Sequence, residues 1–388
     1  MKKRGGNKIN LRKVPKKKHR MADSEIYNVG IKKGTCISRK TAVSILYKAA
    51  LVLLRCDSDT ESESEEENDD EFLYHLSKYD ELIAIICAQD EIKNHKNYIE
   101  NILQTYTEEK FRYRFRLSSE VFASIVDMFG KSDTYIALRA DKRLTAKTYV
   151  AVFLWFAGDD KCNFRVLANR FKLSISSISR IIDRVTFFLS SLSSKTISWP
   201  TKQKKIETSE FFSEMGFSKA IGCIDCARIA IDTPADRKHN FIDTEGQSTI
   251  CVQGICDENK KFLDVFVGYP GSCRDKLVFQ NSVIYKQLPT NCKNFYLLGD
   301  SAYPCLENLI TPYNDNERLT RIQKKFNIKH SYARMSIDNA FGMLKQRFRQ
   351  LYHCKLKGTQ KLCHFIMACC VLHNIADEND LQFVYEIN

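Results

Sequence analysis

The spacing of hydrophobic residues divides the chain into a helical half and a strand-rich half. From Phe72 to about Trp199, apolar residues recur at three- and four-residue intervals, which is typical of amphipathic helices. Residues 144–158 are apolar on most sides, which predicts a buried helix. Residues 117–129 open with Ser118, a residue type that favours helix N-termini. The pattern therefore predicts a helical region over residues 72–199.

After Pro200 the pattern changes to short β-branched runs bounded by Asp, Gly and Pro. Such runs predict four strands, at residues 219–231, 248–257, 261–271 and 293–300. Three further segments have helical spacing, at residues 275–288, 332–352 and 359–379. Strands followed by a helix, a strand and two helices predict a mixed α/β sheet with flanking helices over residues 218–379.

Residues 1–20 are basic and have few large apolar side chains, and residues 57–71 are an acidic run, so we expect residues 1–71 to be disordered, first as a basic and then as an acidic tail. The compact basic run at Lys16–Arg20 indicates a nuclear-import signal, with a DNA-binding arm or a solubilising tail as alternatives. We therefore expect the protein in the nucleus, with a cytoplasmic fraction as a further possibility. The acidic run at 57–71 contains serines whose phosphorylation would add to its charge, but a plain acidic linker is an equally good interpretation.

Charge and cysteine content narrow the class of protein. The 388 residues carry a net charge of +13, which favours nucleic acid as a partner. No apolar run reaches the ~18 residues of a membrane span, so we expect no membrane association. The 15 cysteines are expected to be reduced thiols. Cys223 and Cys226 have a spacing seen in zinc sites, but no second ligand pair matches it, and small buried residues are the favoured interpretation.

Residues 163–185 contain two short helical patterns on either side of Lys172-Leu173-Ser174. This arrangement resembles a helix-turn-helix, in which Arg180 and Arg184 would be available to DNA phosphates. An ordinary helical hairpin is the alternative, since the turn has no glycine.

Near the C-terminus a cation-rich helical segment, "RMSIDNAFGMLKQRFR", contains a single acid, Asp338. At about 100° per residue, one stripe of this segment is apolar and is expected to face the core: Ile337, Phe341, Leu344, Phe348 and Leu351. The adjacent stripe is polar: Arg334, Asp338, Gly342, Lys345 and Arg349. It offers one acid for a metal ion, cations for phosphates, and a glycine that leaves room beside the acid.

Two further acids lie in or at the end of predicted strands, Asp225 and Asp300. Polar groups at strand ends are candidate site residues in α/β sheets. Around these acids stand "GCIDCARIAI", "GYPGSCRDKLVF", "LLGDSAYP" and "IDNAFGMLKQRFRQL". In this order, the motifs resemble those of the PIF/Harbinger transposases and the Harbinger transposase-derived nucleases of animals, over about residues 110–380.

The resemblance implies a ribonuclease H-like catalytic core of the DDE type, preceded by a helical region with a helix-turn-helix. It implies Asp225, Asp300 and Asp338 as catalytic ligands of Mg²⁺ or Mn²⁺, with Asp275 as a possible additional ligand. Arg334, Lys345 and Arg349 would contact DNA phosphates. A Myb-like DNA-binding protein would be a partner.

Several positions depart from the family pattern. Asp338 stands where the family has Glu, and Cys226-Ala227-Arg228 stands where it has Gly-Thr-His. Two functions therefore remain open: a divalent-metal-dependent DNA endonuclease, or a domesticated, catalytically weak or inactive transposase that binds DNA or protein in the nucleus.

Overall fold

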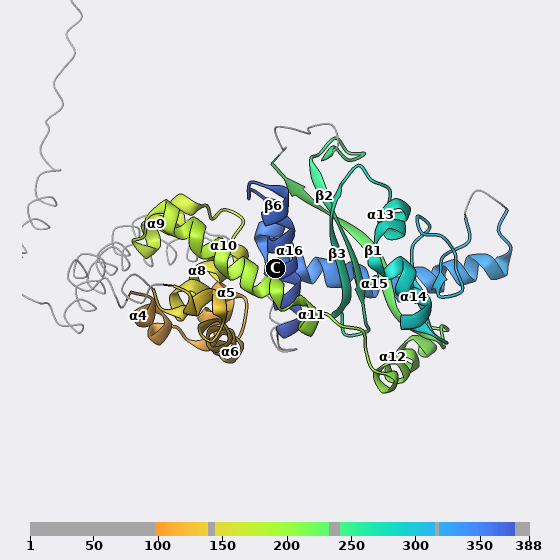
Figure 1. The fold of residues 1–388 in the computed structure, drawn as a ribbon. Coiled ribbons are helices and arrows are strands. Elements are labelled where there is room, and N and C mark those ends of the chain that lie inside the picture. The colour runs from red at the N-terminus through yellow and green to blue at the C-terminus, as the bar shows by residue number, and fades with distance from the viewer. Residues whose placement is uncertain (1–97, 139–143, 233–240, 315–317, 377–388) are drawn as a thin grey trace, which may run out of the picture. The chain divides into compact units, whose positions relative to one another are not determined.

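The computed structural model describes residues 98–138, 144–232, 241–314 and 318–376 (Figure 1). The predictions for the two charged segments and for residues 72–97 of the helical region lie outside these residues.

The first half of the described chain is helical, as its hydrophobic spacing predicts. Its helices are α4 (Tyr98–Thr105), α5 (Glu108–Phe115), α6 (Ser119–Gly130), α7 (Asp133–Ile136), α8 (Ala146–Gly158), α9 (Phe164–Phe171), α10 (Ile175–Ser191), α11 (Ser193–Thr196) and α12 (Lys202–Glu214). Ser118 caps α6 by accepting a hydrogen bond from the Val121 N–H. Every residue of α8 from Tyr149 to Gly158 is buried, which confirms the prediction from its apolar surface.

The described part of the second half contains six strands and four α-helices. The strands are β1 (Ala220–Ile231), β2 (Thr249–Cys256), β3 (Phe262–Pro270), β4 (Tyr296–Leu298), β5 (Leu309–Ile310) and β6 (His353–Cys354). They form one mixed sheet in the order β3-β2-β1-β4-β5, and β6 pairs with the far end of β1. β1, β2 and β3 are antiparallel neighbours, whereas β4 runs parallel to β1 and β5 parallel to β4. The predicted mixed sheet is confirmed; β5 and β6 are too short to show in the hydrophobic pattern.

Helices cover the two faces of this sheet. They are α13 (Asp275–Asn281), α14 (Val283–Cys292), α15 (Arg321–Arg347) and α16 (Thr359–Ile375), with a short 3₁₀ turn, η4 (Arg349–Leu351), after α15. On one face Ile224 and Ile255 pack with Phe279 of α13 and with α14. On the other face the strands belong to the same core as α15 and α16.

Two predicted helix boundaries differ from the structure. The single helix expected at 275–288 is two helices, which divide at Ser282. The helix expected at 332–352 begins at Arg321, because Thr320 and Gln323 form a capping box there, and it ends at Arg347. The predicted apolar stripe of this helix is buried, from Ile337 to Leu351.

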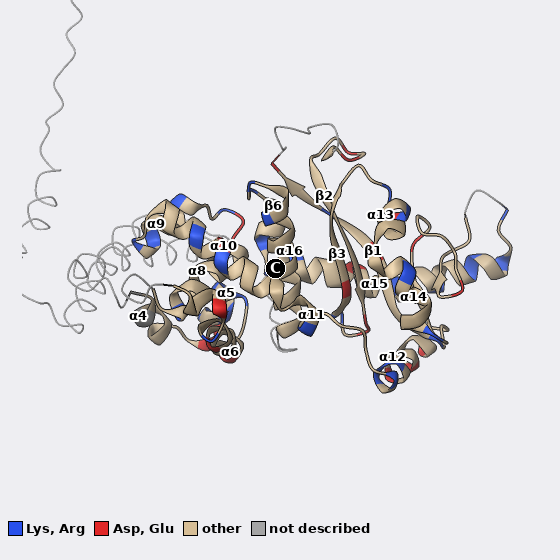
Figure 2. Ribbon diagram, in the orientation of Figure 1, with Lys and Arg blue, Asp and Glu red and all other residues tan. Residues whose placement is uncertain are grey.

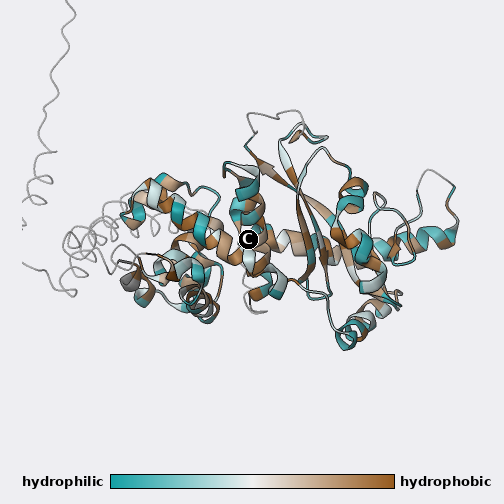
Figure 3. Cartoon of the chain, in the orientation of Figure 1, coloured by the Kyte–Doolittle hydropathy of each residue, from teal (hydrophilic) through white to brown (hydrophobic). Residues whose placement is uncertain are grey.

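The helical half and α16 share one hydrophobic core, to which α10 and α16 both contribute (Figure 3). Polar contacts join the same parts: Ser190 is 2.7 Å from the Nδ1 atom of His364, and Lys361 pairs with Asp183 at 2.6 Å. Gln350 donates to the carbonyl of Asp159 at 2.6 Å. The described helices include none that is both long enough and apolar enough to cross a bilayer.

Candidate functional site

Three carboxylates meet beside the centre of the sheet. Carboxylate oxygens of Asp225 on β1, Asp300 just after β4 and Asp275 at the start of α13 lie within 4.8 Å of one another. The register explains the first two, because Cys223 pairs with Leu298 across the parallel β1–β4 ladder. Two residues further along each strand are Asp225 and Asp300. Neighbouring parallel strands therefore place these two acids side by side although they are far apart in sequence.

An arginine of β1 holds the third carboxylate. The Nη2 atom of Arg228 donates to Oδ1 of Asp275 at 2.6 Å, and the same guanidinium donates to the carbonyls of Gly271 and Cys273 at 3.1 Å. These bonds fix the loop before α13 against β1. Asp275 is thereby placed beside Asp225, with its side chain 17% exposed.

Asp338 lies across Asp225 from this group and is not part of it. Arg334 bridges the two acids: its Nη1 atom donates to Oδ2 of Asp225 at 3.0 Å, and its Nη2 atom is 3.9 Å from Oδ1 of Asp338. The Asp338 side chain is 55% exposed, whereas those of Arg334 and Asp225 are below 20%. A Cβ atom on the exposed Gly342 would meet no atom within 4 Å, so the surface beside Asp338 is open, as the sequence predicts.

Like charges and burial act together on these acids. Burial raises the pKa of Asp300, and the charges of Asp225 and Asp275 raise it further. Burial also raises the pKa of Asp338. The charge of Arg334 lowers this pKa, whereas the charge of Asp225 and a side-chain hydrogen bond with Asp225 raise it. Crowded carboxylates of this kind are stabilised by a cation, and hard oxygen donors are the ligands that Mg²⁺ and Mn²⁺ prefer. The donor set therefore fits a divalent ion.

The structure places the predicted phosphate-binding cations at several different locations. Lys345 is half-buried and donates to the main-chain carbonyl of Arg228 at 2.9 Å. Arg349 lies in η4, beyond the end of α15. Burial lowers the pKa of Arg116, and the positive charge of Arg349 lowers it further. The expectation that Arg349 continues the polar stripe of α15 is wrong, because the helix ends before it.

The expected helix-turn-helix segment consists of α9, a three-residue connection and α10. Lys172 adopts a left-handed conformation at the end of α9, and Ser174 caps α10. Arg180 is exposed on α10, whereas Arg184 is half-buried and donates to the hydroxyl of Tyr149 at 3.3 Å. DNA binding by this segment stays a prediction.

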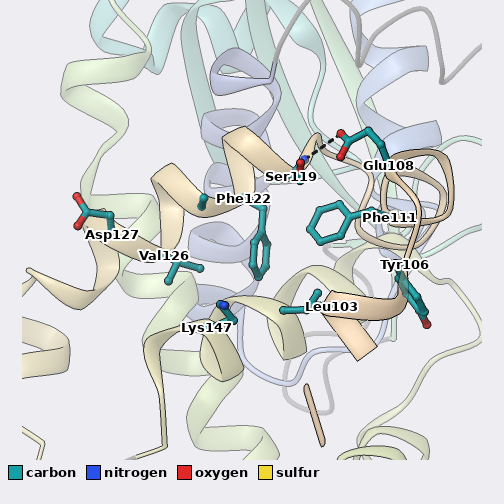
Figure 4. A pocket seen from close by; sticks show the side chains of 10 residues that line it. Leu103, Tyr106, Glu108, Phe111, Ser119, Phe122, Val126, Asp127 and Lys147 are labelled. Atoms are coloured by element: carbon teal, nitrogen blue, oxygen red, sulfur yellow. Dashed lines mark hydrogen bonds between the residues drawn. The ribbon is translucent and has the colours of Figure 1, made fainter. Parts of the chain in front are cut away.

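The described surface has two hollows of interest, one in the helical half and one beside α15. One, of ≈540 Å³, is enclosed by α4, α5, α6 and the start of α8 and is lined by Phe111, Phe122 and Val126, with Lys147 at one side (Figure 4). The other, of ≈750 Å³, lies between α15 and the loop after β5. Ser301, the residue that follows Asp300, lines the second hollow.

Sequence reasoning does not predict the ion pair between Arg228 and Asp275, although both residues lie in motifs that carry the family resemblance.

The two cysteines with the zinc-like spacing, Cys223 and Cys226, lie on the same strand. Cys226 and Cys223 point to opposite faces of β1: Cys223 contacts the Ala333 carbonyl at 3.5 Å on the α15 side, and Cys226 accepts from the Tyr303 hydroxyl at 3.3 Å. A zinc site formed by this pair is therefore excluded.

Residues 224–374 match the family described as DDE superfamily endonuclease, and residues 90–191 match a domain of unknown function. The chain is 30% identical to an Arabidopsis thaliana protein named "Protein ALP1-like", over 60% of this chain and 61% of that protein. It is 27% identical to a Bos taurus protein named "Putative nuclease HARBI1", over 72% of this chain and 81% of that protein. No solved structure matches the chain significantly.

Proposed function

We propose that the chain, whose residues 224–374 belong to the DDE superfamily endonuclease family, is a transposase-derived nuclease that hydrolyses DNA phosphodiesters with divalent metal ions. The observation that carries this proposal is the meeting of the Asp225, Asp275 and Asp300 carboxylates within 4.8 Å. The strand order β3-β2-β1-β4-β5, with three antiparallel strands followed by parallel ones, supports a ribonuclease H-like core. The Bos taurus relative is named a putative nuclease, which agrees with this proposal.

Asp225, Asp275 and Asp300 would hold Mg²⁺ or Mn²⁺, with Asp338 as a further ligand on the far side of Asp225. When bound, such ions activate the attacking water and stabilise the leaving oxygen of the phosphodiester.

The chain's own residues orient these carboxylates. The N–H of Cys226 donates to Oδ1 of Asp225 at 2.8 Å, and the N–H of Ala302 donates to Oδ1 of Asp300 at 3.0 Å. Arg228 holds Asp275 by an ion pair, and Arg334 holds Asp225. Carboxylates fixed in this way lose little conformational freedom when substrate and metal ions bind.

The first half of α15 supports DNA as the substrate. Between residues 318 and 337 the sequence has no Asp or Glu, and it has six cations: Arg318, Arg321, Lys324, Lys325, Lys329 and Arg334. Figure 2 shows cations at the N-terminal end of this helix. Tyr313 and Tyr332 are exposed nearby, and the ≈750 Å³ hollow connects this surface to Ser301. Cations and exposed aromatic rings beside a carboxylate group suit a nucleic-acid backbone and its bases.

Salt dependence tests this surface. Changing Lys324, Lys325 and Lys329 together to Ala should lower the slope of log affinity against log salt by up to about 3 for duplex DNA. Lys286→Ala on α14, which is also exposed, serves as a control and should change the slope by at most about 1. An unchanged slope in the triple variant would show that α15 does not contact phosphates.

Plasmid nicking in Mn²⁺ tests the proposed chemistry. Asp225→Asn and Asp300→Asn should abolish cleavage, and an intact fold should be checked by circular dichroism. Asp275→Asn and Asp338→Asn decide which acid is the third essential ligand, because the first belongs to the close group and the second matches the family position. Asp232→Asn, an exposed acid at the end of β1, is the control and should retain activity.

The second candidate function is a DNA- or protein-binding nuclear factor without cleavage. The observation that favours it is that Asp225 and Asp275 are both already paired with arginines. Absence of Mn²⁺-dependent nicking by the purified wild-type chain, together with retained DNA binding, would select this function. A Myb-like partner is supported by none of the comparisons and stays a prediction.

Nuclear localisation is proposed from the basic run at Lys16–Arg20. Replacing Lys16, Lys17 and Lys18 with Ala should move a fluorescent fusion of the full chain into the cytoplasm. Unchanged nuclear fluorescence would show that import depends on another segment or on a partner.

A further inference from the structure

Next to the carboxylate group, on the face of β1 opposite to the Asp225 side chain, lies a second set of potential metal ligands that also includes Asp275. The Sγ atoms of Cys226 and Cys251 and a carboxylate oxygen of Asp275 lie within 4.8 Å of one another. Both cysteines are free thiols; Cys251 is fully buried and Cys226 is partly buried. In a tetrahedral zinc site with Zn–S bonds of about 2.3 Å, ligand atoms are roughly 3.5–4 Å apart. The observed spacing is compatible with that geometry after small adjustments.

A fourth polar side chain in the same place has no partner. Gln253 lies directly opposite Cys226 in the β1–β2 ladder, and two residues before it is Cys251, so all three side chains are on one face of the sheet. Gln253 is 0% exposed, and neither its Oε1 nor its Nε2 atom makes a hydrogen bond. A buried amide without partners costs about 1–3 kcal/mol. Its amide oxygen is a suitable fourth ligand or a partner for a ligand-bound water.

The charges at this place balance around a divalent ion. Arg228 donates to Asp275 at 2.6 Å and to Sγ of Cys251 at 3.5 Å, so its charge compensates that of the carboxylate. A dication that replaces the two thiol protons leaves the net charge of the buried site unchanged. Arg228 then acts as an outer hydrogen-bond donor to two of the ligands, an arrangement that is common around metal sites.

We propose that Cys226, Cys251 and Asp275, with Gln253, form a site for one thiophilic divalent ion of the zinc class, separate from the Mg²⁺- or Mn²⁺-binding group. Thiolates select such ions over Mg²⁺. Asp275 belongs to both groups, so the occupancies of the two sites are coupled through this one carboxyl.

Cadmium binding to the full chain tests the site, because Cd²⁺–thiolate bonds absorb in the ultraviolet and need no enzymatic readout. The reduced, metal-free protein should show a charge-transfer band that saturates at one Cd²⁺ per chain. Cys226→Ser and Cys251→Ser should each lose the saturating band. Cys256→Ser is the matched control: Cys256 is opposite Cys223 on the other face of the same two strands, and its band should equal that of wild type.

Two further measurements keep the test independent of folding defects and of the nuclease proposal. Alkylation followed by mass spectrometry of wild-type protein should show Cys226 protected by Zn²⁺, without any substitution. Asp225→Asn should keep the Cd²⁺ band even if it abolishes cleavage, because Asp225 is not a ligand of this site. No thiolate band in wild type, a band unchanged in both Cys226→Ser and Cys251→Ser, or Cys226 alkylation unaffected by Zn²⁺ would overturn the proposal.

Discussion

Replacing Arg334 with Gln should destabilise the protein without metal and strengthen its binding of metal. Gln retains a polar side chain, which is shorter, and removes the positive charge. Arg334 donates to Asp225 at 3.0 Å and is 3.9 Å from Asp338, and both Arg334 and Asp225 are below 20% exposed. Burial lowers the pKa of Arg334, but the charges of Asp225, Asp338 and Asp300 outweigh it and raise that pKa. The guanidinium is therefore the counter-ion of the carboxylate group.

The size of the effect follows from these contacts. A hydrogen bond to a charged group contributes about 1.5–3 kcal/mol, and removing one partner of a fully buried ion pair costs about 3–5 kcal/mol. Since this pair retains some exposure, we expect a loss of about 2–3 kcal/mol. At about 2–4 °C per kcal/mol for a chain of this order of size, Tm in EDTA should fall by roughly 4–12 °C.

Thermal unfolding in EDTA and in Mn²⁺ measures both effects. A divalent ion near Asp225 is repelled by the guanidinium, so its removal should tighten Mn²⁺ binding by about tenfold or more, which is about 1.4 kcal/mol or more. Mn²⁺ should therefore raise the Tm of Arg334→Gln more than that of wild type. Arg321→Gln, at an exposed position of the same helix, should show neither effect. Equal metal-induced shifts in wild type and Arg334→Gln would refute the competition between Arg334 and the ion.

Three other substitutions have defined outcomes. Burial, with the charge of Arg347, lowers the pKa of His373 from 6.5 to about 3, so the unfolded chain takes up a proton between these pH values while the folded chain does not. His373 should therefore make the free energy of unfolding fall with decreasing pH in this window, by up to about 1.4 kcal/mol per pH unit. In urea unfolding, the free energy of His373→Gln should depend less steeply on pH than that of wild type. Parallel pH profiles of the two proteins would contradict this. A Cβ atom at Gly254 would be 2.8 Å from Cζ of Phe341, so Gly254→Ala should cost about 1–3 kcal/mol in urea unfolding; an unchanged midpoint would mean that α15 shifts freely. Lys345→Met should lower stability by about 1.5–3 kcal/mol yet leave DNA affinity unchanged, because its ammonium donates to the Arg228 carbonyl; a large loss of DNA affinity in a binding titration would restore it as a phosphate contact.

The sequence by itself determined the elements that depend on short-range pattern. The buried helix α8, the strands β1 to β3 and the apolar stripe from Ile337 to Leu351 all follow from hydrophobic spacing, because each needs one or more faces to be apolar. Asp225 and Asp300 were identified because the acids stand inside or just after apolar strands, where their carboxylates contrast with the surrounding pattern.

Only the tertiary structure decided which side chains meet. The parallel β1–β4 register places Asp300 beside Asp225, and the Arg228 ion pair brings Asp275 to them across a loop. The end of α15 before Arg349 depends on the tertiary packing of the following turn, which angular periodicity cannot detect. Contacts of this kind join residues tens of positions apart, and their geometry depends on sheet register and helix packing, to which no local pattern is sensitive.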